Sequence, residues 1–104
     1  MKIDPKMVAE LYNKYRFRAQ TGNNVNNDCC CALTIIHIDL HGKPEDGQYI
    51  ADRVFDTCNT LYGKEYVNGF WRGFDKHNIV KEASSEGYAN GVAVREYLTE
   101  HGYF

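Results

Sequence analysis

The chain has 104 residues, of which 43% are hydrophobic and 25% are charged, and its formal net charge is −2. A globular chain of this length buries about 65% of its unfolded surface, which is enough for a core without disulfide staples. The basic residues are scattered among acidic ones, whereas nucleic-acid-binding proteins concentrate basic residues to displace counterions from phosphates. We therefore expect one domain over residues 1–104 that does not bind nucleic acid.

The N-terminal sequence Met1-Lys2-Ile3-Asp4-Pro5 has no apolar stretch of the kind that follows the lysine in a signal peptide. The longest apolar run, Cys29 to Ile36, is much shorter than the ~20 residues that cross a bilayer. These features predict a cytoplasmic protein that does not associate with membranes.

The first helix is predicted from Asp4, which can cap it, and from Pro5, which suits the first helical position. Gly22 is the expected end of this helix, and the polar residues 23–27 are expected to form a loop. Apolar residues recur between these limits at helical spacing: Met7, Val8, Leu11, Tyr12, Tyr15 and Ala19.

Residues 28–41 fit two structures. As a helix, the segment has Asp28 as its cap and Gly42 as its stop, and it is apolar around most of its circumference. As a strand, residues 33–41 alternate between apolar and polar positions, and their β-branched content agrees with that. We expect the helix, placed centrally in the core, and keep an α+β fold with a strand at 33–41 as the alternative.

Three more helices are expected after the turn at residues 43–47. One spans Glu45 to Tyr62 and stops at Gly63, and the last begins at Ser84 or Ser85 and ends near Glu100. The helix between them has an inward face made of Tyr66, Val67, Phe70, Trp71 and Phe74. The predicted fold is therefore all-α, a compact bundle of about five helices.

Three stretches carry a resemblance: Cys30-Cys-Ala-Leu33, Tyr66-Val-Asn-Gly-Phe-Trp-Arg-Gly-Phe-Asp75 and Gly87-Tyr-Ala-Asn-Gly-Val-Ala-Val-Arg-Glu96. Their cadence, Tyr-Val-x-Gly-Phe-x-x-Gly-Phe-Asp, resembles that of small helical bacterial proteins with no assigned role. The resemblance implies a helical domain and a helix at residues 29–41. It implies no activity, cofactor or catalytic residue.

His37 and His41 are candidate metal ligands, because a spacing of four places both imidazoles on one face of a helix. Ile38 stands where a zinc protease would carry its glutamate, so that class is excluded. A third ligand would have to come from Cys58, His77, His101 or a carboxylate. The alternative interpretation is a polar stripe near a helix end.

Cys29, Cys30 and Cys31 are a candidate redox site. If Asp28 caps the helix, the three thiols lie in its first turn, where the helix dipole favours the thiolate. Adjacent cysteines are poorly placed to form disulfides with each other, and cysteine is often a small buried hydrophobe. Core filling is therefore the alternative.

The last helix carries Tyr88 and Val92 on one side and Val94 and Leu98 on nearly the opposite side. Two apolar faces predict that the helix is covered twice, either by a partner chain or by a larger core. Gly69 and Gly73, one turn apart, predict that another backbone packs closely against their helix. We take these six residues as a candidate interface.

Phosphate-binding loops, nucleophile elbows and calcium loops are missing from the sequence, so we expect no cofactor and lean against an enzyme. The predicted function is a small helical protein-interaction module that self-associates or binds a protein partner. The alternative is a metal- or redox-responsive protein that uses His37, His41 and the cysteines.

Overall fold

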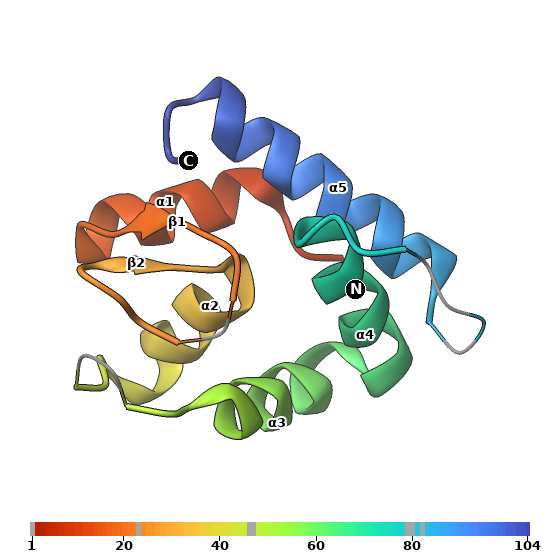
Figure 1. The fold of residues 1–104 in the computed structure, drawn as a ribbon, viewed down its shortest axis with the longest axis horizontal. Coiled ribbons are helices and arrows are strands. Elements are labelled where there is room, and N and C mark those ends of the chain that lie inside the picture. The colour runs from red at the N-terminus through yellow and green to blue at the C-terminus, as the bar shows by residue number, and fades with distance from the viewer. Residues whose placement is uncertain (1, 23, 46–47, 79–80, 82) are drawn as a thin grey trace.

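The computed structural model describes residues 2–22, 24–45, 48–78, 81 and 83–104, and it is predominantly helical (Figure 1). The elements are α1 (Pro5–Tyr15), β1 (Arg18–Ala19), β2 (Cys29–Cys30), α2 (Ala32–His41), α3 (Ala51–Tyr62), α4 (Lys64–Phe74) and α5 (Ser85–Glu100). The predicted all-α bundle of about five helices is confirmed. The alternative strand at 33–41 is wrong, because α2 occupies that segment.

Each helix packs chiefly against its neighbours in sequence, and α5 returns to pack against α1. Figure 1 shows the resulting ring, with α3 opposite the pair formed by α1 and α5. Residues 32–38 of α2 are all buried. A helix that is apolar nearly all round belongs inside a core, as the sequence predicted.

Several helix ends follow the local sequence. Asp4 Oδ1 accepts a hydrogen bond of 3.0 Å from the Lys6 N–H, and Ser84 Oγ accepts one of 3.0 Å from the Gly87 N–H. Gly42 and Gly63 end α2 and α3 with φ angles of 91° and 92°, which glycine adopts without steric cost. These four predictions are confirmed.

The predicted end of the first helix at Gly22 is wrong. The helix stops at Tyr15 because Arg16 takes a left-handed conformation with φ of 59°. The chain then runs into β1, where the Arg18 N–H donates to the Asp28 carbonyl at 2.9 Å. Burial of Phe17 and this long-range pairing outweigh the helical periodicity of residues 16–19.

The predicted start of the third helix at Glu45 is also wrong, since α3 begins at Ala51. The Ile50 N–H donates to Asn24 Oδ1 at 3.1 Å, which ties the approach to α3 to the asparagine-rich segment. Ile50 itself is buried. Residues 46 and 47 of the predicted helix lie outside the described residues.

Asp28 does not cap a helix, contrary to the sequence prediction. It has a φ of 59°, and the following Cys29–Cys30 pair in parallel with Arg18–Ala19 as β2. The N-cap of α2 is Cys31, and the Tyr12 hydroxyl donates to the Cys30 carbonyl at 2.7 Å. The cysteines therefore precede α2 instead of forming its first turn.

The contact between α4 and α5 is the most extensive between two helices, and four buried glycines line it. A Cβ added at Gly69 would lie 2.9 Å from the Tyr88 amide nitrogen, and one at Gly91 would lie 2.8 Å from that of Phe74. Gly73 and Gly87 face backbone carbonyls of the opposite helix in the same way. The close backbone approach predicted from Gly69 and Gly73 is confirmed, and it lies within the chain.

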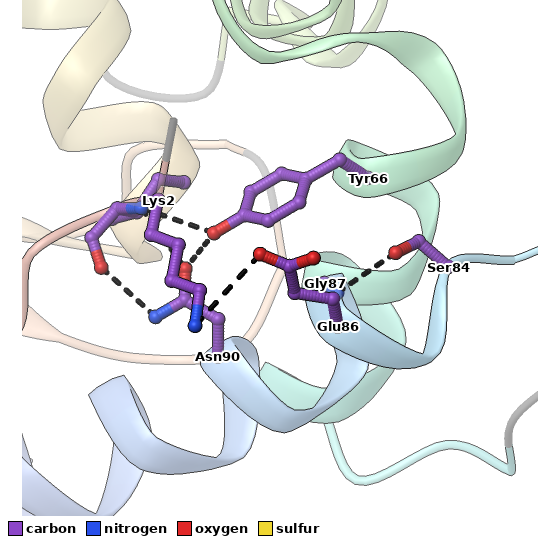
Figure 2. A network of polar contacts seen from close by, with 7 residues as sticks. Lys2, Tyr66, Ser84, Glu86, Gly87 and Asn90 are labelled. Carbon is purple, nitrogen blue, oxygen red and sulfur yellow. Dashed lines mark hydrogen bonds and ion pairs between the residues drawn. The ribbon is translucent and has the colours of Figure 1, made fainter.

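The N-terminal segment is fastened between α4 and α5 (Figure 2). The Asn90 side chain accepts a hydrogen bond from the Ile3 N–H at 3.0 Å and donates one to the Ile3 carbonyl at 2.9 Å. The Tyr66 hydroxyl accepts from the same N–H at 3.0 Å and donates to Asn90 Oδ1. Ile3 is thereby held in the core, and Lys2 lies 3.8 Å from Glu86.

Candidate functional site

A partly open cleft of about 500 Å³ lies between α2 and α3. Its walls come from three parts of the chain: the end of α2 with the residues after it, the approach to α3, and one face of α3. The lining residues are His37, His41, Gly42, Lys43, Pro44, Gln48, Ile50, Arg53, Asp56 and Thr57. Both candidate metal ligands from the sequence thus line one cleft.

His37 lines this cleft with only 8% of its surface exposed. Its Nδ1 lies 2.8 Å from Thr57 Oγ1, so a hydrogen bond from α3 fixes the imidazole. The His41 ring centroid lies 4.8 Å from that of His37. Burial, together with nearby His41 and Arg53, lowers the pKa of His37, so the ring is neutral at pH 7.

Two cationic side chains and one carboxylate line the cleft. Arg53 is exposed, and its guanidinium makes no hydrogen bond or ion pair with another described residue. Lys43 forms an ion pair of 2.7 Å with Asp28 outside the cleft lining. Asp56 contributes the one carboxylate among the lining residues.

The metal prediction needs a third ligand, and none of the described residues supplies one to the two histidines. The described residues contain no group of three or more His, Cys, Asp or Glu side chains that could hold a metal ion. Cys58 is buried and donates to the Leu33 carbonyl at 3.6 Å. The other two histidines pack elsewhere, His77 against Trp71 and His101 against Tyr97.

The candidate redox cysteines Cys29, Cys30 and Cys31, together with the remaining cysteine Cys58, lie largely inside the protein. Cys30, Cys31 and Cys58 are buried and Cys29 is half-buried. Burial raises the pKa of Cys31 to about 11 and that of Cys58 to about 12, and it raises the pKa of Cys30 further still. These three thiols therefore stay protonated, whereas the thiolate is the form that acts as a nucleophile. Their burial is that of cysteines that fill a core.

The candidate interface residues on α4 and α5 divide into two groups. Gly69, Gly73, Val94 and Leu98 are buried against other parts of the same chain, so they present no surface to a second molecule. Tyr88 and Val92 are half-buried, and the Tyr88 hydroxyl donates to the His77 carbonyl at 2.8 Å. The core of the same chain therefore covers one of the two apolar faces that were predicted for the last helix, α5.

Exposed apolar side chains instead gather on the face formed by α2 and α3. Leu40 is 55% exposed and Leu61 is 40% exposed. Both line a shallow hollow of about 370 Å³, which His41, Asp56, Thr57 and Thr60 complete. We call the surface made by these six residues the leucine face. It adjoins the cleft between α2 and α3, because His41, Asp56 and Thr57 line both.

Sequence reasoning missed the contribution of α3 to this site. Arg53, Asp56 and Thr57 are spaced three and four apart, which places them on one face of a helix beside the apolar stripe. That spacing is visible in the sequence. Its pairing with His37 is a tertiary contact between residues 20 apart, which periodicity alone does not specify.

No protein-family model, curated protein or solved structure matches this chain. Among the described residues, none of the helices is both long enough and apolar enough to cross a bilayer.

Proposed function

We propose that this protein is a small cytoplasmic helical interaction module that self-associates through the leucine face. The observation that supports the proposal is the exposure of Leu40 and Leu61 beside one hollow, whereas the other leucines, Leu33 and Leu98, are buried and Leu11 is half-buried. Clustered exposed apolar side chains are typical of protein interaction sites. The weak negative net charge and the scattered basic residues favour a protein partner over nucleic acid.

A second copy of the chain is the proposed occupant. Two copies related by a twofold axis bring the same surface patch of each copy together, so leucines from each copy would fill the combined hollows. A net charge of −2 opposes this association only weakly. Four half-exposed leucines contribute about 1 kcal/mol each when buried, which leaves a weak dimer after the entropic cost of association.

Sedimentation velocity over a range from about 10 µM to about 1 mM tests the proposal, because a weak dimer forms only toward the upper end. We expect the sedimentation coefficient of the native protein to rise with concentration. Leu40→Glu should abolish this rise, because it places a charge in the contact. Tyr49→Ser is the matched control, since Tyr49 is 66% exposed but does not line the hollow.

Two results would contradict the proposal. One is a coefficient that stays constant with concentration in the native protein. The other is a dimer that survives Leu40→Glu but dissociates in Val92→Glu, which would move the interface to the half-buried side of α5.

A further inference from the structure

We propose that the cleft between α2 and α3 binds a small organic anion, with Arg53 contacting a phosphate or carboxylate group and His37, His41 and Thr57 completing the site. This inference does not depend on self-association. It rests on the shape of the cleft, the charges that line it and the position of the histidine pair within it.

The volume of the cleft is that of a small-molecule site. A volume of about 500 Å³ lies within the range of pockets that hold compact metabolites. Ile50 and Pro44 line the cleft beside the polar groups. Small-molecule sites combine such apolar surface with a few placed polar groups, so the organic part of the ligand has a surface to pack against.

The charges favour an anion. A guanidinium forms paired hydrogen bonds with the two oxygens of a carboxylate or phosphate, and Arg53 lines the cleft without another hydrogen-bonding or ion-pairing partner among the described residues. Arg53 is close enough to His37 to lower the pKa of that imidazole. The same positive charge would repel a metal cation from the two histidines.

The histidine pair gives the site a dependence on pH. His37 lies beside His41 on its own helix and Thr57 on α3, and the charged side chains of Arg53, Asp56 and Lys43 line the same cleft. Without an anion, the neighbouring cations and burial favour neutral His37. A bound anion favours the imidazolium, so binding should tighten as the pH falls from about 8 to about 6. Sulfate tests this dependence, because its own charge does not change over that range.

Titration of the histidine side-chain signals by heteronuclear NMR is the experiment. The probes are phenyl phosphate, benzoate, inorganic phosphate and sulfate, added separately to the native protein in a non-anionic buffer, and sulfate is titrated at both ends of the pH range. We expect saturable shifts of the His37 and His41 signals with phenyl phosphate or benzoate. The tighter of the two identifies the anionic group, and a response to inorganic phosphate shows that the anion alone suffices.

Arg53→Gln should weaken this binding by about tenfold or more, because it removes a charge-assisted pair of hydrogen bonds. Arg72→Gln is the matched control: it removes the same charge from α4, where Arg72 lies over Trp71 and outside the cleft lining. The Arg72→Gln protein should bind the anion with the affinity of the native protein. The Leu40→Glu protein should also bind the anion, so a loss of the dimer and a loss of anion binding can be told apart.

Three results would overturn the inference. Unsaturable shifts with every anion mean that the cleft binds none of them. Equal affinity in Arg53→Gln and the native protein removes Arg53 from the site. Saturation by zinc chloride alone, lost in His37→Ala, makes the cleft a metal site.

Discussion

Substituting Gly91 by alanine tests the close packing of α5 against α4. The added methyl group would meet backbone atoms of α4, lying 2.8 Å from the Phe74 amide nitrogen and 3.0 Å from the Phe70 carbonyl carbon. Ordinary Cβ contacts begin at 3.4 Å. Because these atoms belong to the backbone of a packed helix, no side-chain rotation relieves the overlap, and α5 has to move away from α4.

Two effects of opposite sign set the size of the change. Alanine is about 1 kcal/mol better than glycine inside a helix. Overpacking of a core costs about 1–3 kcal/mol, and a clash with backbone belongs at the upper end of that range. The free energy of unfolding should therefore fall by about 2 kcal/mol, which lowers Tm by about 10 °C in a domain of this size.

Thermal and urea unfolding followed by far-UV circular dichroism measure this change. Ala93→Gly is the control, because Ala93 is exposed on the same helix and reports helix propensity alone, with an expected loss of about 1 kcal/mol. A Gly91→Ala protein as stable as the native one, or more stable, would refute the close-packing argument, since propensity would then outweigh the overlap.

Three further predictions concern the N-terminal segment, the buried histidine and the thiols. Asn90→Ala should lower the free energy of unfolding by about 1–3 kcal/mol in urea titrations, because it leaves the backbone of Ile3 without two hydrogen bonds; unchanged stability would contradict this. The pKa of His37 is lower in the folded protein than in the unfolded chain, so as the pH falls the imidazole is protonated more readily in the unfolded chain. The free energy of unfolding should therefore decrease as the pH drops below about 6.5. His37→Gln should show a smaller loss of Tm between about pH 7.5 and about pH 5.5, and an identical loss would contradict the assignment. Alkylation of the folded protein with iodoacetamide, followed by peptide mass spectrometry, should modify half-buried Cys29 first; early modification of the three buried thiols would contradict their raised pKa values.

Much of the local structure follows from the sequence because its causes are local. Asp4 with Pro5, and Ser84, start helices through bonds to amide groups two or three residues away. Gly42 and Gly63 end helices through their own backbone conformation. The apolar character of residues 32–38 places α2 in the core whatever packs around it.

The errors in the sequence predictions lie where distant residues decide the structure. The end of α1 depends on the pairing of β1 with β2. The same pairing places Cys29 and Cys30 in a strand instead of in the first turn of a helix. The cleft lies between α2 and α3, whose His37 and Thr57 come within hydrogen-bonding distance although they are far apart in the sequence. Periodicity in a sequence records which face of a helix is buried, but not which helix buries it. The sequence alone therefore determined the all-α class and the helix signals, whereas the tertiary structure decided that Gly69 and Gly73 meet their own chain and that Leu40 and Leu61 face outward.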